Sequence, residues 1–174
     1  MKKWFLLTCV FSCHLLFAQT KGLPSCKNIK EKLAQVNVSF DHIIEKFATK
    51  EDKVSLIKTY FSDFAICGQK GKIKDYGRNI EFIFSFSDAD YGGSRNQFRD
   101  FYKKLFKKLK DEFATSHVYK IAKDSSAKSS YFYEKGKNIA LSKKNIKLSL
   151  VYKDPVDETT AYSVLLVFEY YRKR

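Results

Sequence analysis

The run 162–171 constrains the fold more than any other segment, because it is apolar on both faces of an extended chain. Residues two apart share one face of a strand. A strand that is apolar on both faces has to be covered on both, so it belongs in the middle of a sheet. One face would carry Tyr162, Val164, Leu166, Phe168 and Tyr170, and the other Leu165 and Val167.

Four further segments have the composition or the alternation of short strands. In the segment 80–86, every second residue from Ile80 onward is isoleucine or phenylalanine. Short connections separate the later segments, so we expect antiparallel pairing. The other three predicted strands are 131–134, 139–141 and 146–152.

Three segments carry apolar residues at helical spacing. The first is 29–47, and the second is 54–64, which ends shortly before Gly68. The third, 98–113, is the clearest amphipathic helix, with leucine and aromatic residues on one face and lysines on the other. The apolar stripe of the first helix consists of Ile29, Leu33, Val36, Phe40, Ile43 and Phe47.

Together these elements predict an α+β fold: an antiparallel sheet of four to five strands with two or three helices packed on one face, in the order α-α-β-α-β-β-β. Residues 68–78, with three glycines, are expected to form a loop or an irregular hairpin. The element order is similar to that of cone-like cystatin-like and nuclear-transport-factor-like domains, which curl a sheet around a helix. That similarity covers element order alone and assigns no residue.

The first eighteen residues have the layout of a secretory signal peptide. Lys2 and Lys3 precede the apolar run 4–17, and Ala18 offers a small residue for cleavage. We therefore predict a signal peptide over 1–18, a single domain over 19–174, and a secreted or periplasmic protein without a transmembrane anchor after cleavage. Lipidation at Cys13 is a weaker alternative, because the residues after it are apolar where a lipoprotein has a polar tether.

Cleavage would leave two cysteines, Cys26 and Cys67. An even pair in an exported protein suggests one disulfide. If 29–47 and 54–64 form an antiparallel helical hairpin, the two cysteines lie at the same end of it. The alternative is two separately buried thiols.

The chain is strongly basic, with 33 Lys and Arg against 19 Asp and Glu and a formal charge of +14. The polar face of the predicted helix 98–113 is the densest basic feature, through Lys103, Lys104, Lys107 and Lys108. A basic surface favours a polyanion or an acidic protein as partner, and here an anionic component of the cell envelope. Export disfavours nucleic acid as a partner. Extracellular nucleic acid is the form that an exported protein could still bind. The alternative is a lysine-covered surface that serves solubility alone.

Tyrosines gather in the C-terminal strands. If the sheet were concave, Tyr131, Tyr133 and Tyr170 would line a small-ligand pocket. The alternative is packing within the sheet, with the hydroxyl groups at its rim.

The sequence predicts no cofactor, no metal site and no catalytic motif. Its main functional prediction is an exported, non-catalytic binding domain. The alternative is a small, basic, nuclease-like hydrolase that uses His42 and His117 as acid and base, which requires both imidazoles at one site.

Overall fold

The computed structural model describes residues 22–54, 56–113, 116–121, 126–134, 136–137, 141–152 and 162–172. The predicted signal peptide 1–18, and with it Cys13, lies outside the described residues. So does most of the predicted strand 139–141, of which only Leu141 is described, in a turn.

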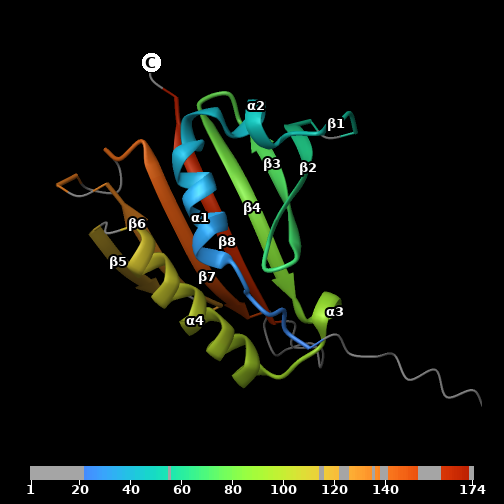
Figure 1. Ribbon diagram of the computed structural model, residues 1–174, viewed down its shortest axis with the longest axis vertical. Coiled ribbons are helices and arrows are strands. Elements are labelled where there is room, and N and C mark those ends of the chain that lie inside the picture. The colour runs from blue at the N-terminus through green and yellow to red at the C-terminus, as the bar shows by residue number, and fades with distance from the viewer. Residues whose placement is uncertain are drawn as a thin grey trace, which may run out of the picture.

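One eight-stranded antiparallel sheet dominates the described residues, in the order β1-β2-β3-β4-β8-β7-β6-β5 (Figure 1). It is built from two meanders of four strands that meet where β4 pairs with β8. The strands are β1 Lys50–Asp52, β2 Lys58–Ile66, β3 Gln69–Asp75, β4 Asn79–Ser87, β5 Ser116–Ile121, β6 Ala127–Tyr133, β7 Lys144–Tyr152 and β8 Tyr162–Tyr171.

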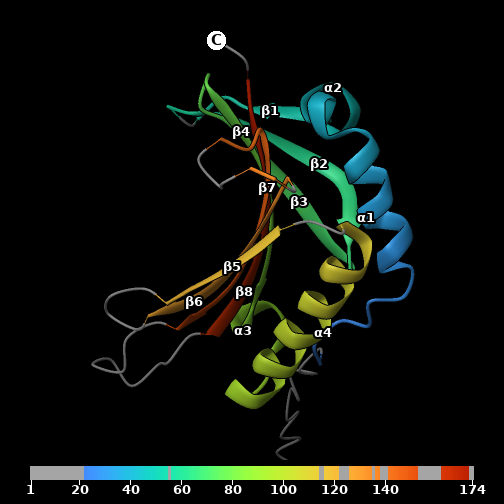
Figure 2. The same ribbon diagram turned by 90° about the vertical axis from the view of Figure 1, so that its left-hand side faces the viewer.

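Four α-helices and one 3₁₀ helix accompany the sheet in the described residues. The two longest, α1 and α4, lie on the same side of the sheet (Figure 2). Helix α4 contacts β6, β7, β8 and α1, and it carries the chain from one meander to the far edge of the other. The helices are α1 Ile29–Val38, η1 Phe40–His42, α2 Ile43–Phe47, α3 Asp88–Tyr91 and α4 Arg95–Phe113.

The predicted sheet of four to five strands with two or three helices is therefore wrong, although the α+β class is right. The order α-α-β-α-β-β-β fails with it, because the first meander contributes strands where a helix and a loop were expected. The short edge strand β5 was missed too, because its residues are mostly exposed and show no clear apolar face.

The segment predicted as the helix 54–64 is mostly strand β2. A bulge shifts its pairing with β3 between Phe61 and Ala65, which disrupts the alternation that identifies a strand. The glycine expected to end a helix instead forms a hairpin turn: Cys67 and Gly68 both have positive φ, as a two-residue type I′ turn requires.

The predicted loop 68–78 contains strand β3. Gly71 lies inside this strand because the rings of Phe82 and Phe84 occupy the space that its Cβ would need. Gly77 does form a turn, with φ of 81°. A glycine that signals a loop by composition can therefore also mark a close approach of a ring to the backbone.

The predicted helix 29–47 is interrupted at Ser39, whose backbone leaves the helical region, and continues as η1 and α2. All six residues of its apolar stripe are nevertheless buried, as predicted. At the start of α1, Asn28 is in the left-handed region and makes no side-chain capping bond.

A disulfide joins Cys26 to Cys67, with the two Cα atoms 4.4 Å apart. The predicted bond is confirmed, but the helical hairpin used to argue for it is wrong. Cys26 precedes α1, and Cys67 sits in the β2–β3 turn, so the bond fastens a hairpin of the sheet to the start of a helix.

Strand β8 is central in the sheet, as predicted, and its Phe168 is fully buried in the core. The Phe168 ring lies 5.9 Å from the ring of Phe40 in η1, 6.1 Å from Phe84 in β4 and 6.4 Å from Phe113 in α4. Helices and both meanders therefore share one aromatic cluster.

The two faces of α4 should respond differently to truncation. Leu105 is buried and Lys107 is exposed. We expect Leu105→Ala to cost about 2–5 kcal/mol of unfolding free energy, through lost burial and the cavity left behind. Lys107→Ala should change it by less than about 0.5 kcal/mol. Urea unfolding measures both, and equal effects would contradict the assignment of the faces.

Removing the disulfide should lower stability without changing the fold. The bond spans a sequence separation of 41 residues, so its loss frees a long loop in the unfolded chain. We expect the double variant Cys26→Ser and Cys67→Ser to lose roughly 2–5 kcal/mol. Chemical unfolding with and without reductant tests this: reductant should destabilise the wild type and leave the double variant unchanged.

Candidate binding groove beside helix α4

Helix α4 begins with a hydrogen bond between a side chain and the backbone. The side chain of Gln97 accepts a hydrogen bond from the backbone N–H of Ser94 at 2.6 Å, which is half of a capping box. The apolar face then turns to the sheet and leaves the lysine face to solvent. The buried side chains are Phe98, Phe101, Leu105, Leu109 and Phe113.

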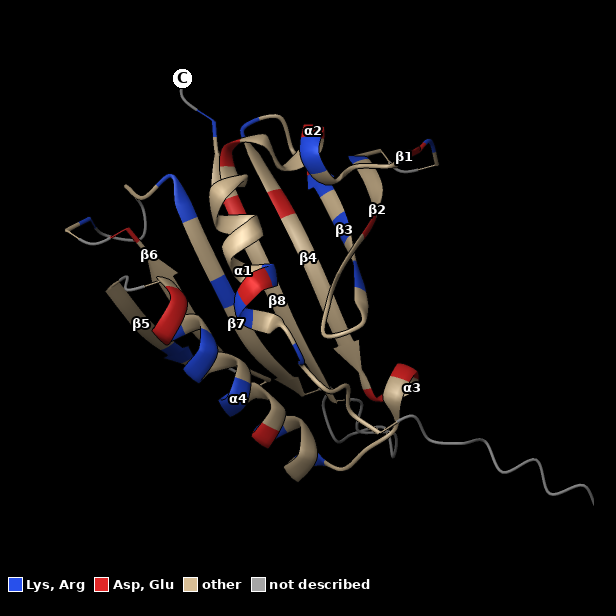
Figure 3. Ribbon diagram, in the orientation of Figure 1, with Lys and Arg blue, Asp and Glu red and all other residues tan. Residues whose placement is uncertain are grey.

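The four lysines singled out in the sequence, Lys103, Lys104, Lys107 and Lys108, are all exposed on this helix. Figure 3 shows basic segments along most of its length. Lys103 makes a long ion pair with Asp100, at 3.8 Å. Among the described residues, the other three make no ion pair.

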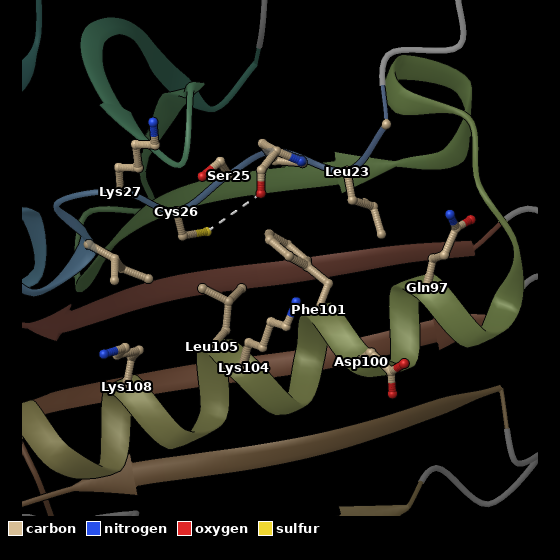
Figure 4. A pocket seen from close by; sticks show the side chains of 13 residues that line it. Leu23, Ser25, Cys26, Lys27, Gln97, Asp100, Phe101, Lys104, Leu105 and Lys108 are labelled. Carbon is tan, nitrogen blue, oxygen red and sulfur yellow. Dashed lines mark hydrogen bonds between the residues drawn. The ribbon is translucent and has the colours of Figure 1, made fainter.

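A hollow with a volume of about 660 Å³ lies between α4 and the segment that enters α1. We call it the α4 groove. In Figure 4, Phe101 and Leu105 rise from α4 toward the segment that carries Leu23 and Cys26. The lining side chains include Leu23, Cys26, Lys27 and Ile29 on one side and Gln97, Asp100, Phe101, Lys104, Leu105 and Lys108 on the other.

The α4 groove combines an apolar floor with a basic rim. Ile29, Phe101 and Leu105 are buried, whereas Lys27, Lys104 and Lys108 are exposed. Its acidic residue, Asp100, is engaged by Lys103. The disulfide of Cys26 holds one wall in place. Such a groove suits a ligand that has an apolar part and a negative charge.

A smaller hollow, of about 230 Å³, lies on the other side of α4 and contains His117. The His117 ring packs 5.0 Å from Phe106 and 5.2 Å from Phe132. Burial, and then the charge of Lys110, lowers the pKa of His117, which favours the neutral imidazole. The remaining lining residues are Tyr102, Lys103, Tyr119 and Ser130.

The structure does not bring His42 and His117 together. His42 is exposed on η1, where its Nδ1 lies 2.7 Å from a carboxylate oxygen of Glu45. The strand pairing places His117 three strands from Phe168, the residue under η1, or about 14 Å at the usual strand spacing. Acid and base groups that share a reaction need to be within hydrogen-bond reach of one substrate.

The three tyrosines singled out in the sequence do not share a face. Tyr131 and Tyr133 lie on the side of the sheet away from α4, where Lys120 and Lys147 approach the Tyr131 ring at 5.3 and 5.7 Å. Tyr170 faces the other way and packs against the core. The register of β6, β7 and β8 separates them, because side chains alternate between the two faces along each strand.

Sequence reasoning missed a pair of opposed carboxylates on the sheet face away from α4. Glu81 of β4 and Glu169 of β8 are direct cross-strand partners. The hydroxyl of Tyr76 donates to Glu81 at 3.3 Å, and that of Tyr171 donates to Glu169 at 3.4 Å. Burial, followed by the charge of Glu81, raises the pKa of Glu169. Only the pairing of β4 with β8, distant in sequence, could have identified them.

Within the described ranges, no three His, Cys, Asp or Glu side chains group as metal ligands. None of the helices in that part of the chain is long and apolar enough to cross a membrane. No protein-family model, curated protein or solved structure matches this chain.

The raised pKa of Glu169 predicts a pH-dependent stability. A carboxyl whose pKa is higher in the folded than in the unfolded state stabilises the fold below the ordinary value of 4.5 and loses that contribution as pH rises. Glu169→Gln should therefore gain stability over the wild type at neutral pH, by a few tenths to about 1 kcal/mol, and little in acid. Urea unfolding at several pH values measures the difference.

Glu51→Gln is the matched control, because Glu51 is an exposed strand residue paired with Tyr60 rather than with another acid. A gain for Glu169→Gln that is the same at acid and neutral pH would contradict the electrostatic cause.

Proposed function

We propose that this chain is an exported, non-catalytic binding domain that holds an anionic amphiphile of the cell envelope in the α4 groove. The observation that carries the proposal is the basic rim of Lys27, Lys104 and Lys108 above an apolar floor. An apolar chain would lie on Phe101 and Leu105, and the anionic head group would meet the lysines.

The basic residues of the rim are lysines, which suit an anionic group that is held without one fixed binding geometry. Lysine is a flexible point charge and does not impose the two-pronged geometry of arginine. Lys104 and Lys108 are four residues apart and therefore lie on one side of the helix, beside the groove. Their charge is available because the described residues offer them no ion-pair partner.

The disulfide supports export. Disulfides form and persist in oxidising compartments outside the cytosol. The bond between Cys26 and Cys67 therefore agrees with the signal peptide predicted over 1–18. Export would bring the groove into contact with envelope lipids and their head groups.

Lysophosphatidylglycerol and lysophosphatidylcholine of equal chain length test the proposal, because both carry one phosphate but only the first has a net negative charge. We expect the wild type to bind the anionic lipid at least about tenfold more tightly, since in the other lipid the choline ammonium offsets the phosphate charge and is repelled by the lysines. Lys104→Glu with Lys108→Glu should remove this preference. Equilibrium dialysis below the micelle concentration measures both affinities.

Lys46→Glu with Lys50→Glu is the matched control, because these lysines are exposed, carry the same charge and lie outside the groove. An equal loss in both double variants would mean that net charge rather than the groove attracts the lipid. Tight binding of heparin by the wild type with no binding of either lipid would favour a polyanion or an acidic protein as the partner.

A further inference from the structure

The turn between β1 and β2 exposes large aliphatic side chains at one edge of the sheet. The exposed fractions are 94% for Val54, 107% for Leu56 and 38% for Ile57. Leaving such side chains in water forgoes the stabilisation that burial gives. The turn projects from the body of the protein in both views (Figures 1 and 2). Its side chains can therefore contact another molecular surface without the rest of the sheet touching that surface.

These side chains belong to a larger apolar surface. Leu56 and Ile57 share a hollow of about 400 Å³ with Tyr76, which lies in the β3–β4 turn. The Tyr76 ring is partly exposed, and its hydroxyl donates to Glu81. A tyrosine with an apolar ring and a polar tip is the residue type found at the boundary between lipid and water. We call Val54, Leu56, Ile57 and Tyr76 the apolar tip.

Basic residues border the apolar tip. Lys53 and Lys58 flank the turn itself, and Arg78 is exposed in the neighbouring turn. The charge of two nearby acids is already compensated: Asp52 pairs with Lys72 at 3.8 Å, and Asp75 with Arg172 at 3.0 Å. Glu51 is the exposed acid that remains beside the turn.

We propose that the apolar tip docks this protein on an anionic lipid bilayer, with its aliphatic side chains in the head-group region and Lys53, Lys58 and Arg78 against the lipid phosphates. Amphipathic surfaces bind membranes by this combination of buried apolar area and electrostatic attraction. The complementary charge favours a bilayer over a second copy of this basic chain, which would bring lysines against lysines. The inference does not rest on the α4 groove, which lies on other elements.

Co-sedimentation with vesicles tests the proposal on the protein as the cell exports it. We expect binding to vesicles that contain phosphatidylglycerol and much weaker binding to phosphatidylcholine alone. Val54→Ser with Leu56→Ser should lower the partition coefficient about tenfold or more, because two apolar side chains no longer enter the lipid. Their exposure predicts an unchanged thermal unfolding midpoint, which is measured alongside.

Ile121→Ser is the matched control. Ile121 is also a large exposed aliphatic residue, at 54%, but it ends β5 at the opposite edge of the sheet. This variant should bind vesicles as the wild type does. An equal loss for Ile121→Ser and for the tip variant would overturn the proposal.

A fluorescent reporter tests insertion directly. Trp4, the sole tryptophan of the sequence, lies in the predicted signal peptide, so Leu56→Trp gives the exported protein a single tryptophan at the tip. Its emission should shift to the blue with anionic vesicles, and that of Ile121→Trp should not. Emission that stays as in water, or tip-dependent self-association without lipid, would overturn the proposal, the latter in favour of a contact between copies of the chain.

Discussion

The packing of Phe168 is the interaction on which the rest of the structure depends. This residue lies on β8, where the two meanders join, and its ring contacts η1, β4 and α4. Each meander has one face that needs cover: α1 and α2 contact β2 of the first, and α4 contacts β6, β7 and β8 of the second. Aromatic rings suit this position because they bury a large area and tolerate edge-on contacts from several directions.

The α4 groove lies at the edge of this core, beside the start of α1. Helix α4 crosses one meander, whereas Cys26 is fastened to the turn at the end of a hairpin in the other. The segment entering α1 is thereby held beside α4 with a hollow between them. The groove is lined by this segment and by α4, which the disulfide and helix packing attach to different meanders, so its shape depends on both meanders being formed.

The two proposed surfaces use the same chemistry in different geometries. In the groove, lysines border a recessed apolar floor, whereas at the tip they border protruding aliphatic side chains. A recess suits a single amphiphile, and a projection suits a continuous lipid surface. A protein with both could hold an anionic lipid while resting on a membrane that contains it.

The sequence by itself determined the features that depend on neighbours along the chain: the helix of Leu105 and its lysine face, the central strand of Phe168, and a pair of cysteines suited to a bond. Helical spacing and strand alternation are local, so they can be read directly. Tertiary structure decided the rest. A bulge between Phe61 and Ala65 disrupts the alternation of strand β2, so its sequence resembles a helix. The opposition of Glu81 and Glu169 and the separation of Tyr170 from Tyr131 arose only from strand order and register, which are set by contacts between residues far apart in the chain.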